Sequence, residues 1–327
     1  MKILRHATER SFVSAEKAVE FSVVVVTHNS ENEIGPCLRS VVQELSPFTY
    51  EILVIDNGSG DDTRRVVTRF MLDSGARSGA VQLMANERNL GFTRALNQGL
   101  RNCRGRFVMT LNPDTELLPG SVTRLRDALR AEETLGVVAP QLLYGDGSVQ
   151  PTCRHFPRRQ DVLWQITGLS YLFPGSKRFN HWKMGEFDHS TRRRVDQCQG
   201  ACLLFPRYVL ENVGLWDERF PMFFSDVDWC KRVKESGYDI LFEPEAKVVH
   251  LQGVSVFKRR ARMIWTSHRS FYDYFKKHER KFMFVNEIFG LILLLTCILR
   301  ICAVPFHDSK EGETHATEYP GRNSGKG

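Results

Sequence analysis

Apolar runs alternate with amphipathic stretches over the first third of the chain. The run Phe21–Val26 reads Phe-Ser-Val-Val-Val-Val, which is typical of a strand covered on both faces. Further strands are predicted at Glu51–Ile55, Val81–Ala85 and Phe107–Leu111. Helices are predicted over 31–44, from 63 through Leu72, and over 92–103. Strands that alternate with helices of about ten to fifteen residues predict right-handed βαβ crossovers and a mostly parallel sheet.

The pattern changes after Gly136. A strand is predicted over Val137–Leu143, and a helix over Val227–Glu235. Short strand candidates surround that helix at Cys202–Phe205, Asp239–Phe242 and Lys247–His250. The segment Gln160–Arg194 has weak periodicity and many aromatic and basic residues, so we expect a mobile insert over a functional site. The fold class is therefore α/β.

The predicted strand before Leu111 ends in Asn112-Pro113-Asp114. A carboxylate at the C-terminal end of such a strand points into the crevice where ligands bind. Divalent cations that accompany diphosphates take carboxylate oxygens as ligands and keep phosphates in their other positions. The same triad could instead form a turn and cap a helix that begins between Leu117 and Ser121.

A second polar turn, Asp56-Asn57-Gly58-Ser59, follows the second predicted strand. A carboxylate there can accept hydrogen bonds from a nucleobase or a ribose, and it can also belong to a glycine turn that caps the next helix. No GxxxxGK[ST] loop and no GxGxxG motif follows the first strand. P-loop NTPases and common dinucleotide enzymes are therefore not supported.

Amide and small residues open the third predicted helix. Gly91 permits close backbone approach, and Asn89 and Asn97 can donate hydrogen bonds to ligand oxygens. Glycine and alanine at these places also suit helix–sheet packing, so the motif is compatible with both interpretations.

Two carboxylates, Asp226 and Asp228, lie at the start of the predicted helix that ends at Glu235. A helix N-terminus stabilises the ionised carboxylate, whereas burial opposes it. Asp226 facing a cleft is a candidate general base, and Asp228 is expected to brace the helix. His250 ends an apolar strand; such a histidine is often structural, but it becomes a credible ligand beside a carboxylate-held cation.

Charge is concentrated near the C-terminus. Residues 256–281 hold nine basic residues against Asp273 and Glu279, which accounts for the whole net charge of +7. The apolar run Ile288–Leu299 follows. Basic, aromatic and apolar residues in this order predict contact with an anionic cytoplasmic membrane surface, through an interfacial or re-entrant helix or, as the rival, a true span. No nucleic-acid motif accompanies the basic residues, so nucleic acid is not an expected partner.

The remaining composition is that of an ordinary globular protein, with 42% hydrophobic and 25% charged residues. The eight cysteines are scattered singly, which favours buried free thiols in a reducing cytoplasm. Residues near Met1 lack the pattern of a secretory signal. We expect residues 1–20 to be a poorly ordered lead-in and residues 307–327 a disordered tail.

Several ordered blocks of the chain resemble glycosyltransferase family 2, in its rhamnosyltransferase-like branch. The blocks are Val24–Asn29, Ile55–Ser59, Asn89–Phe92 with Ala95 and Asn97, Leu111–Asp114, Gly200-Ala201, Gly214–Glu218, Asp226–Cys230, and Val249-His250 with Gly253. The resemblance spans about Phe21 to Ser255 and continues weakly into Arg269–Lys276.

The resemblance implies a GT-A fold, with a nucleotide-sugar half over 21–116, an acceptor half over 117–255 and a membrane-associating segment over 256–306. It implies an inverting, metal-dependent transferase that moves a sugar, rhamnose by branch likeness, from a nucleotide diphosphate to a hydroxyl of a lipid-linked or cell-surface glycan. Mg²⁺ or Mn²⁺ would be held by Asp114 and His250, and Asp226 would be the catalytic base. Nucleotide-sugar contacts would come from Thr27, Asn29, Asp56, Asn89, Gly91, Asn97 and Asn112. Acceptor contacts would come from Gly200, Trp216, Asp217 and Ser225.

The chain departs from the family at one position of the site: Ser225 stands where the family usually has Glu before the catalytic Asp226. The loss of a like-charged neighbour should lower the proton affinity of Asp226. We interpret this as a change in how the acceptor is held. The alternatives are a catalytically weak scaffold that binds nucleotide-sugar or glycan, and a nucleotidyltransferase. Nucleotidyltransferases usually have a Gly-rich loop with a basic residue directly after the first strand. This chain has Thr-His-Asn-Ser-Glu there, at Thr27–Glu31.

Overall fold

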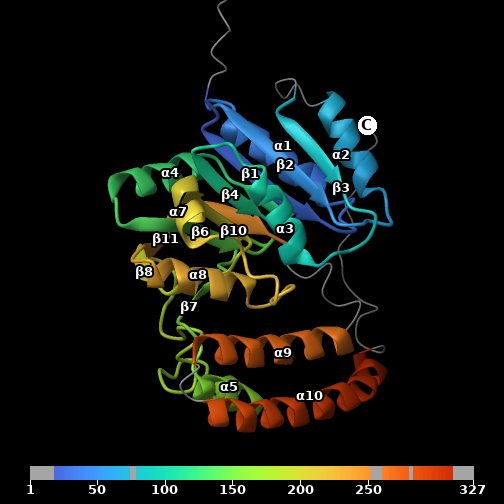
Figure 1. The fold of residues 1–327 in the computed structure, drawn as a ribbon, viewed down its shortest axis with the longest axis vertical. Helices are drawn as coiled ribbons and strands as arrows, with labels where there is room; N and C mark the ends of the chain where they lie inside the picture. Colours follow the sequence, from blue (N-terminus) through green and yellow to red (C-terminus); the bar gives the residue numbers. More distant parts are fainter. Residues whose placement is uncertain (1–17, 74–78, 252–259, 280–282, 312–327) are drawn as a thin grey trace, which may run out of the picture.

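The computed structural model describes residues 18–73, 79–251, 260–279 and 283–311. A nine-stranded mixed sheet with helices on both faces forms the upper part of the molecule, and two long helices lie across its lower end (Figure 1). Gly253, most of the lead-in 1–20, part of the basic stretch 256–281 and residues 312–327 of the expected tail lie outside the described residues.

The N-terminal half supplies four parallel strands in the order β3-β2-β1-β4. They are β1 (Phe21–Thr27), β2 (Tyr50–Asp56), β3 (Val81–Ala85) and β4 (Phe107–Leu111). The crossovers are α1 (Ile34–Leu45), α2 (Thr63–Asp73) and α3 (Phe92–Arg101). This half confirms the predicted βαβ rhythm. The register sets Thr27 opposite Asp56 and Val25 opposite Leu111, so these strands end at one edge of the sheet.

The C-terminal half extends the same sheet with antiparallel and parallel pairs. Strand β10 (Cys202–Pro206) lies antiparallel between β4 and β6 (Leu135–Leu143), and β11 (Asp239–His250) runs parallel to β6. The other edge of β11 pairs with β8 (Arg193–Val195) and β5 (Thr115–Leu117). The two short strands predicted over 239–250 are thus one strand, interrupted by a register shift between Glu243 and Lys247.

Two apolar layers cover the sheet. The buried residues of α1, α2 and α4 (Ser121–Ala131) share one core cluster. Those of α3, α7 (Arg207–Val213) and α8 (Ser225–Glu235) share a second cluster on the other face. The two-stranded sheet of β7 (Cys153–Arg154) and β9 (Gln197–Cys198) lies beside α8.

The segment predicted as a mobile insert contains α5 (Arg159–Ile166) and α6 (Leu169–Leu172). It buries polar residues of its own, including Asp161, Asn180 and His189. Trp182 packs on Phe224, with ring centroids 6.0 Å apart. The insert therefore lies against the residue that precedes Ser225 and Asp226.

Helices α9 (Arg260–His278) and α10 (Met283–Glu311) lie side by side at the lower end of the molecule (Figure 1). A third apolar cluster joins α9 to α5, α8 and α10. One stripe of α10, made of Asn286, Phe289, Leu293 and Cys297, is buried. The helix continues through Glu311, so it extends into the segment from 307 expected as a tail.

All eight cysteines are free, and seven of them are buried; Cys302 is exposed. The buried thiols agree with the prediction for those seven. Cys153 and Cys198 face one another across the β7–β9 pair, with 3.8 Å between their sulfur atoms.

Candidate active site

The site is assembled where β1, β2 and β4 end. Thr27 and Asp56 are register partners at the ends of β1 and β2, and Asn112 follows β4 directly. The backbone N–H of Asn112 donates to the Ala201 carbonyl at 2.9 Å, which brings the segment before β10 to the same edge. Residues from four distant parts of the sequence therefore meet at the carboxyl edge of the parallel strands, as an α/β fold predicts.

Asp56 is completely buried at this edge. Its Oδ2 accepts hydrogen bonds from Arg64 Nε at 2.5 Å and from the Ser59 backbone at 3.3 Å. Its Oδ1, and the hydroxyl of the neighbouring Thr27, are buried without a hydrogen-bond partner among the described residues. Because buried polar atoms are nearly always satisfied, these two oxygens mark the place where a ligand donor group would bind.

The loop around this pocket is held by side-chain amides. Asn57 Nδ2 donates to Asn89 Oδ1 at 3.1 Å, and Asn29 Oδ1 accepts from the Gly60 N–H at 2.8 Å. Gly91 begins α3 with a φ of 90°, where a side chain would be strained. The side chains of Asn29 and Asn89 thus hold the polar loops beside Asp56 together.

Asp114 and His250 are brought together by the pairing of β5 with β11. His250 is the register partner of Thr115, and the Leu251 N–H donates to the Asp114 carbonyl at 3.0 Å. His250 Nε2 then lies 3.4 Å from Asp114 Oδ1 and 3.5 Å from Asn112 Nδ2. The three side chains predicted for one site are therefore in contact.

Gln150 orients this histidine, and the sequence analysis missed it. Gln150 Oε1 lies 3.0 Å from His250 Nδ1, and Gln150 Nε2 donates to the His250 carbonyl at 2.6 Å. A proton on Nδ1 leaves the lone pair of Nε2 directed toward Asp114. Gln150 lies 100 positions before His250, and no sequence spacing indicates the pair.

The donor set fits a divalent cation that takes its other ligands from phosphates. Among the described residues no group of three or more potential ligands exists, so the protein would supply the Asp114 oxygen and the His250 nitrogen, with the Asn112 amide adjacent. Few protein ligands and several substrate oxygens are typical of Mg²⁺ and Mn²⁺ on diphosphates.

Asp226 lies in the first turn of α8. Its Oδ2 accepts from the Gly200 N–H at 3.0 Å, and its Oδ1 accepts from the Val227 N–H at 2.9 Å. Burial raises the pKa of this carboxyl, and the two backbone N–H groups and Arg154 oppose the rise. A carboxylate with raised proton affinity is suited to general-base chemistry. Gly200 also adjoins Ala201, which connects Asp226 to Asn112.

The backbone before Asp226 is strained. Phe224 has a φ of 67°, which is unusual for a bulky residue, and its buried ring packs 4.5 Å from that of Phe271 in α9. Ser225 is buried, and its hydroxyl donates to the Met222 carbonyl. Strain of this kind occurs at sites where the surroundings fix a functional group.

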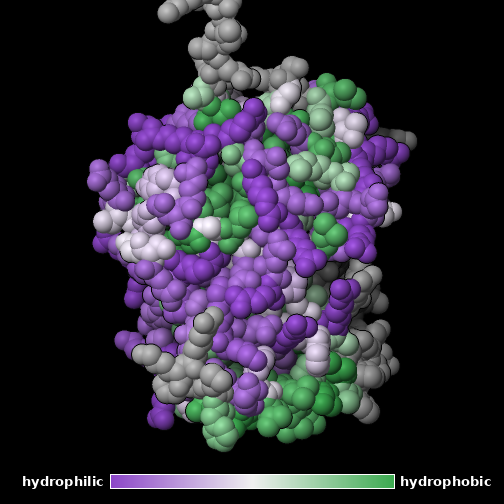
Figure 2. Space-filling model, in the orientation of Figure 1, coloured by the Kyte–Doolittle hydropathy of each residue, from purple (hydrophilic) through white to green (hydrophobic). Residues whose placement is uncertain are grey.

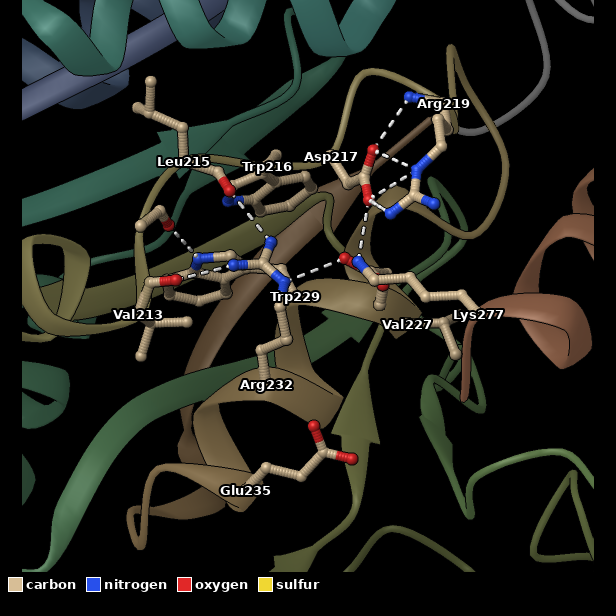
Figure 3. A network of polar contacts seen from close by, with 12 residues as sticks. Val213, Leu215, Trp216, Asp217, Arg219, Val227, Trp229, Arg232, Glu235 and Lys277 are labelled. Carbon is tan, nitrogen blue, oxygen red and sulfur yellow. Dashed lines mark hydrogen bonds and ion pairs between the residues drawn. The ribbon is translucent and has the colours of Figure 1, made fainter. Parts of the chain in front are cut away.

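Asp228 does not face the site but joins α8 to α9, as its expected bracing role implies. Its carboxylate pairs with Arg232 at 3.0 Å, Lys277 at 2.5 Å and His278 at 2.8 Å. Figure 3 shows the part of this network around Arg232 and Lys277, in which Arg232 also reaches the carbonyls of Val213 and Leu215. These cations lower the pKa of Asp228 although burial opposes the shift.

Three predicted contact residues belong to this scaffold. Both amide atoms of Asn97 bond to the Trp216 backbone, at 2.8 and 3.1 Å. Trp216 is 2% exposed and stacks on Trp229, and Asp217 pairs with Arg219 and Lys277 (Figure 3). Asn97 and Asp217 thus have partners within the protein, whereas the buried indole N–H of Trp216 has no hydrogen-bond partner among the described residues.

The comparisons with known proteins agree with this geometry. The family model of glycosyl transferase family 2 matches residues 22–214. The chain belongs to this family. It is a glycosyltransferase of the rhamnosyltransferase-like branch that uses a nucleotide-sugar donor.

Curated relatives cover most of the chain. N-acetylglucosaminyl-diphospho-decaprenol L-rhamnosyltransferase of Mycobacterium tuberculosis is 28% identical over 265 residues, which are 76% of this chain and 82% of the relative. Low-salt glycan biosynthesis hexosyltransferase Agl10 of Haloferax volcanii is 22% identical over 83% of this chain and 77% of its own length.

Solved structures show the same fold, GT-A. The mannosyltransferase PcManGT from Pyrobaculum calidifontis, in complex with GDP-Man and Mn²⁺, aligns with a TM-score of 0.54 at 17% identity, over 92% of this chain and 76% of that one. GalNAc-T7 with UDP, GalNAc and Mn²⁺ also aligns at 0.54 and 17% identity, over 72% of this chain and 44% of that one.

Proposed function

We propose that this glycosyltransferase is metal-dependent and inverting, and that it transfers a deoxyhexose such as rhamnose to a sugar hydroxyl on a lipid-linked diphosphate acceptor. The observation that carries the proposal is the chain of contacts from Asp226 through Gly200 and Ala201 to Asn112, beside Asp114 and His250. These contacts support a base and a diphosphate site on one edge of the sheet.

The donor would bind across the ends of β1, β2 and β4. The free Oδ1 of Asp56 would accept a hydrogen bond from the nucleobase. Asp114 and His250 would hold a Mg²⁺ or Mn²⁺ ion, which neutralises charge on the departing diphosphate. Two structures of the same fold support a divalent cation here: PcManGT was solved with GDP-Man and Mn²⁺, and GalNAc-T7 with UDP, GalNAc and Mn²⁺.

Asp226 would remove the proton from the acceptor hydroxyl. The hydroxyl oxygen forms a bond to the anomeric carbon as the bond from that carbon to the diphosphate oxygen breaks, and the electron pair leaves with the nucleotide diphosphate. A single displacement from the opposite face inverts the anomeric configuration. The raised pKa of Asp226 strengthens it as a base for this step.

The acceptor class follows from the relative and from the surface of α10. The M. tuberculosis relative is named for a diphospho-decaprenol acceptor. Figure 2 shows apolar side chains gathered at the lower end of the molecule, where α10 exposes Phe284, Leu291, Leu295 and Leu299. Residues 284–302 are long and apolar enough to cross a membrane by length and composition.

We favour an interfacial position for this helix at the cytoplasmic membrane face. Its buried stripe packs along α9, and the exposed cations Arg262, Arg269 and Lys276 of α9 would meet anionic headgroups. A flotation assay with vesicles tests this: the protein should bind vesicles that contain phosphatidylglycerol, and Leu291→Glu with Leu295→Glu should abolish binding. Carbonate extraction that leaves the protein in the membrane pellet would favour a span instead.

Release of nucleotide from a panel of dTDP-, UDP- and GDP-sugars, with membrane extract as acceptor, tests the reaction. We expect Mg²⁺- or Mn²⁺-dependent release from one donor, and loss of release in Asp226→Asn. If the wild type and Asp226→Asn both bind the donor and neither releases nucleotide, the non-catalytic scaffold is favoured. That alternative is motivated by Ser225, which replaces the usual Glu of the family.

A further inference from the structure

A cation without a carboxylate partner lies beside the proposed base. Arg154 is in β7 and pairs with Gln197 of β9, the strand that leads to Gly200. Its Nη1 donates to the Cys153 carbonyl at 2.8 Å, and no carboxylate of the described residues lies within 4.0 Å of it. Gly200, three residues after Gln197, donates its N–H to Asp226 at 3.0 Å, so Arg154 lies on the strand that pairs with the segment leading to the base, and its charge opposes the raised pKa of Asp226.

A second cation, Lys183, comes from the insert. Its Nζ lies 4.8 Å from the centre of the Tyr171 ring, and it also has no ion pair among the described residues. Burial and the nearby Arg154 lower the pKa of Lys183. Two half-buried cations that repel one another are costly unless an anion binds between them.

The place of these cations points to one substrate. Tyr171, Leu172 and Phe173 expose apolar side chains on the insert, while Trp182, next to Lys183, packs on Phe224 near Asp226. The backbone N–H of His155 donates to the Trp182 carbonyl at 3.0 Å, which sets the neighbours of Arg154 and Lys183 in contact. The insert therefore carries an exposed apolar surface at Tyr171–Phe173, a cation on Tyr171, and a contact with the residue two positions before the base. A polyprenyl diphosphate has the matching order of parts: an apolar chain, two phosphates and then the sugar.

We propose that Arg154 and Lys183 bind the diphosphate of the lipid-linked acceptor, with the prenyl chain on Tyr171–Phe173 and the acceptor sugar at Asp226. The proposal rests on the proposed transferase function and names the group that holds its acceptor. Arginine suits this role because its planar fork binds two phosphate oxygens at once. The separate Asp114–His250 pair would remain for the donor diphosphate.

Binding of geranylgeranyl diphosphate in phosphatidylcholine vesicles, compared with geranylgeraniol, tests the site without requiring transfer. The wild type should prefer the diphosphate. Arg154→Gln and Lys183→Met should each weaken its binding about tenfold or more, the loss expected of one charge-assisted contact, and Arg154→Lys should recover part of it. Arg130→Gln removes an exposed charge on α4 and should change nothing.

Lys183→Met keeps an apolar stem on Tyr171, so thermal unfolding should confirm that this variant is folded. Equal binding by the wild type and both variants, or no preference for the diphosphate, would overturn the proposal. A rise in the KM for the nucleotide-sugar with unchanged prenyl diphosphate binding would assign the cations to the donor and would also overturn it. A wild type that binds the diphosphate but transfers no sugar would contradict the proposed function alone.

Discussion

The backbone N–H of Gly200 donates to Asp226 Oδ2 at 3.0 Å, in a space where a side chain at Gly200 would be tight against Asp226. A Cβ atom there would lie 3.1 Å from Asp226 Cβ and 3.4 Å from Trp216 Cη2. The buried Trp216 is stacked on Trp229 and cannot move away freely. Glycine thus lets the backbone hold the carboxylate in one position, next to the segment that contacts Asn112.

Gly200→Ala should displace Asp226 by a few tenths of an ångström or more. We expect kcat to fall by about 10- to 100-fold with a small change in stability, since catalysis is more sensitive to misplacement than folding is. Gly175→Ala is the matched control, because a Cβ there contacts nothing within 4 Å. Steady-state kinetics with both variants would decide, and equal activities would show that Gly200 does not position the base.

Asp226→Asn should lower transfer by about 10²- to 10⁴-fold, the usual range for loss of a general base, and leave donor binding intact. In the wild type, burial raises the pKa of Asp226 above its ordinary value of 3.8, so kcat should increase with pH as this group loses its proton. A flat profile across acidic pH would argue against Asp226 as the base.

The same raised pKa has a cost for folding. The folded protein binds the Asp226 proton more tightly than the unfolded chain, so stability from this group is present at low pH and decreases as pH rises from 3.8 through the raised pKa. Asp226→Asn removes the buried charge but weakens the bond from Val227 N–H. We expect the unfolding free energy of Asp226→Asn at pH 7 to lie within about 1 kcal/mol of the wild-type value. Urea denaturation measures this difference. A much larger loss of stability would show that Asp226 is chiefly structural.

Gln150→Leu should weaken metal activation. The buried amide fixes the tautomer and orientation of His250, and loss of such a partner lowers metal affinity by about 10- to 100-fold. The Mn²⁺ concentration for half-maximal activity should rise in Gln150→Leu. It should rise less in Gln150→Glu, because the carboxylate keeps an acceptor for His250 Nδ1. An unchanged Mn²⁺ dependence in Gln150→Leu would remove His250 from the metal site.

Asp228→Asn should destabilise the protein by about 3 kcal/mol or more, because it leaves Lys277 and His278 without their shared counter-charge in a buried place. Neighbouring cations lower the pKa of Asp228, so its stabilisation is complete above 3.8 and is lost as pH falls below that value. Asp127→Asn, an exposed carboxylate paired with Arg126, should cost less than about 1 kcal/mol. Similar urea midpoints for the two variants would contradict the bracing role.

Local sequence pattern predicted the parallel half of the sheet well, since β1, β2 and β4 are continuous apolar runs. It also placed Asp56, Asp114 and His250 at strand ends, where the fold brings them to one edge. It could not show that 239–250 is a single strand, because the irregularity after Glu243 interrupts the apolar pattern. Strand β5 was missed because three residues carry too little periodicity.

Contacts between distant residues were not predictable from spacing. Gln150 binds His250 across 100 positions, and Lys277 reaches Asp217 across 60. Trp216 and Asn97, which lie in family blocks and are predicted to contact ligands, are both buried, and Asn97 bonds to the Trp216 backbone, a contact across 119 positions that no spacing indicates. A family motif indicates which residues belong to the site region. Only the packing distinguishes residues that are placed to contact a ligand from residues that position them.

The most direct test of the central claim is transfer of radiolabelled sugar from the nucleotide donor to a prenyl-diphosphate-linked N-acetylglucosamine, measured as label in the organic phase. We predict metal-dependent label with wild type and almost none with Asp226→Asn, although that variant still binds the donor. Equal label with both proteins would contradict the assignment of Asp226 as the base and the reaction built on it.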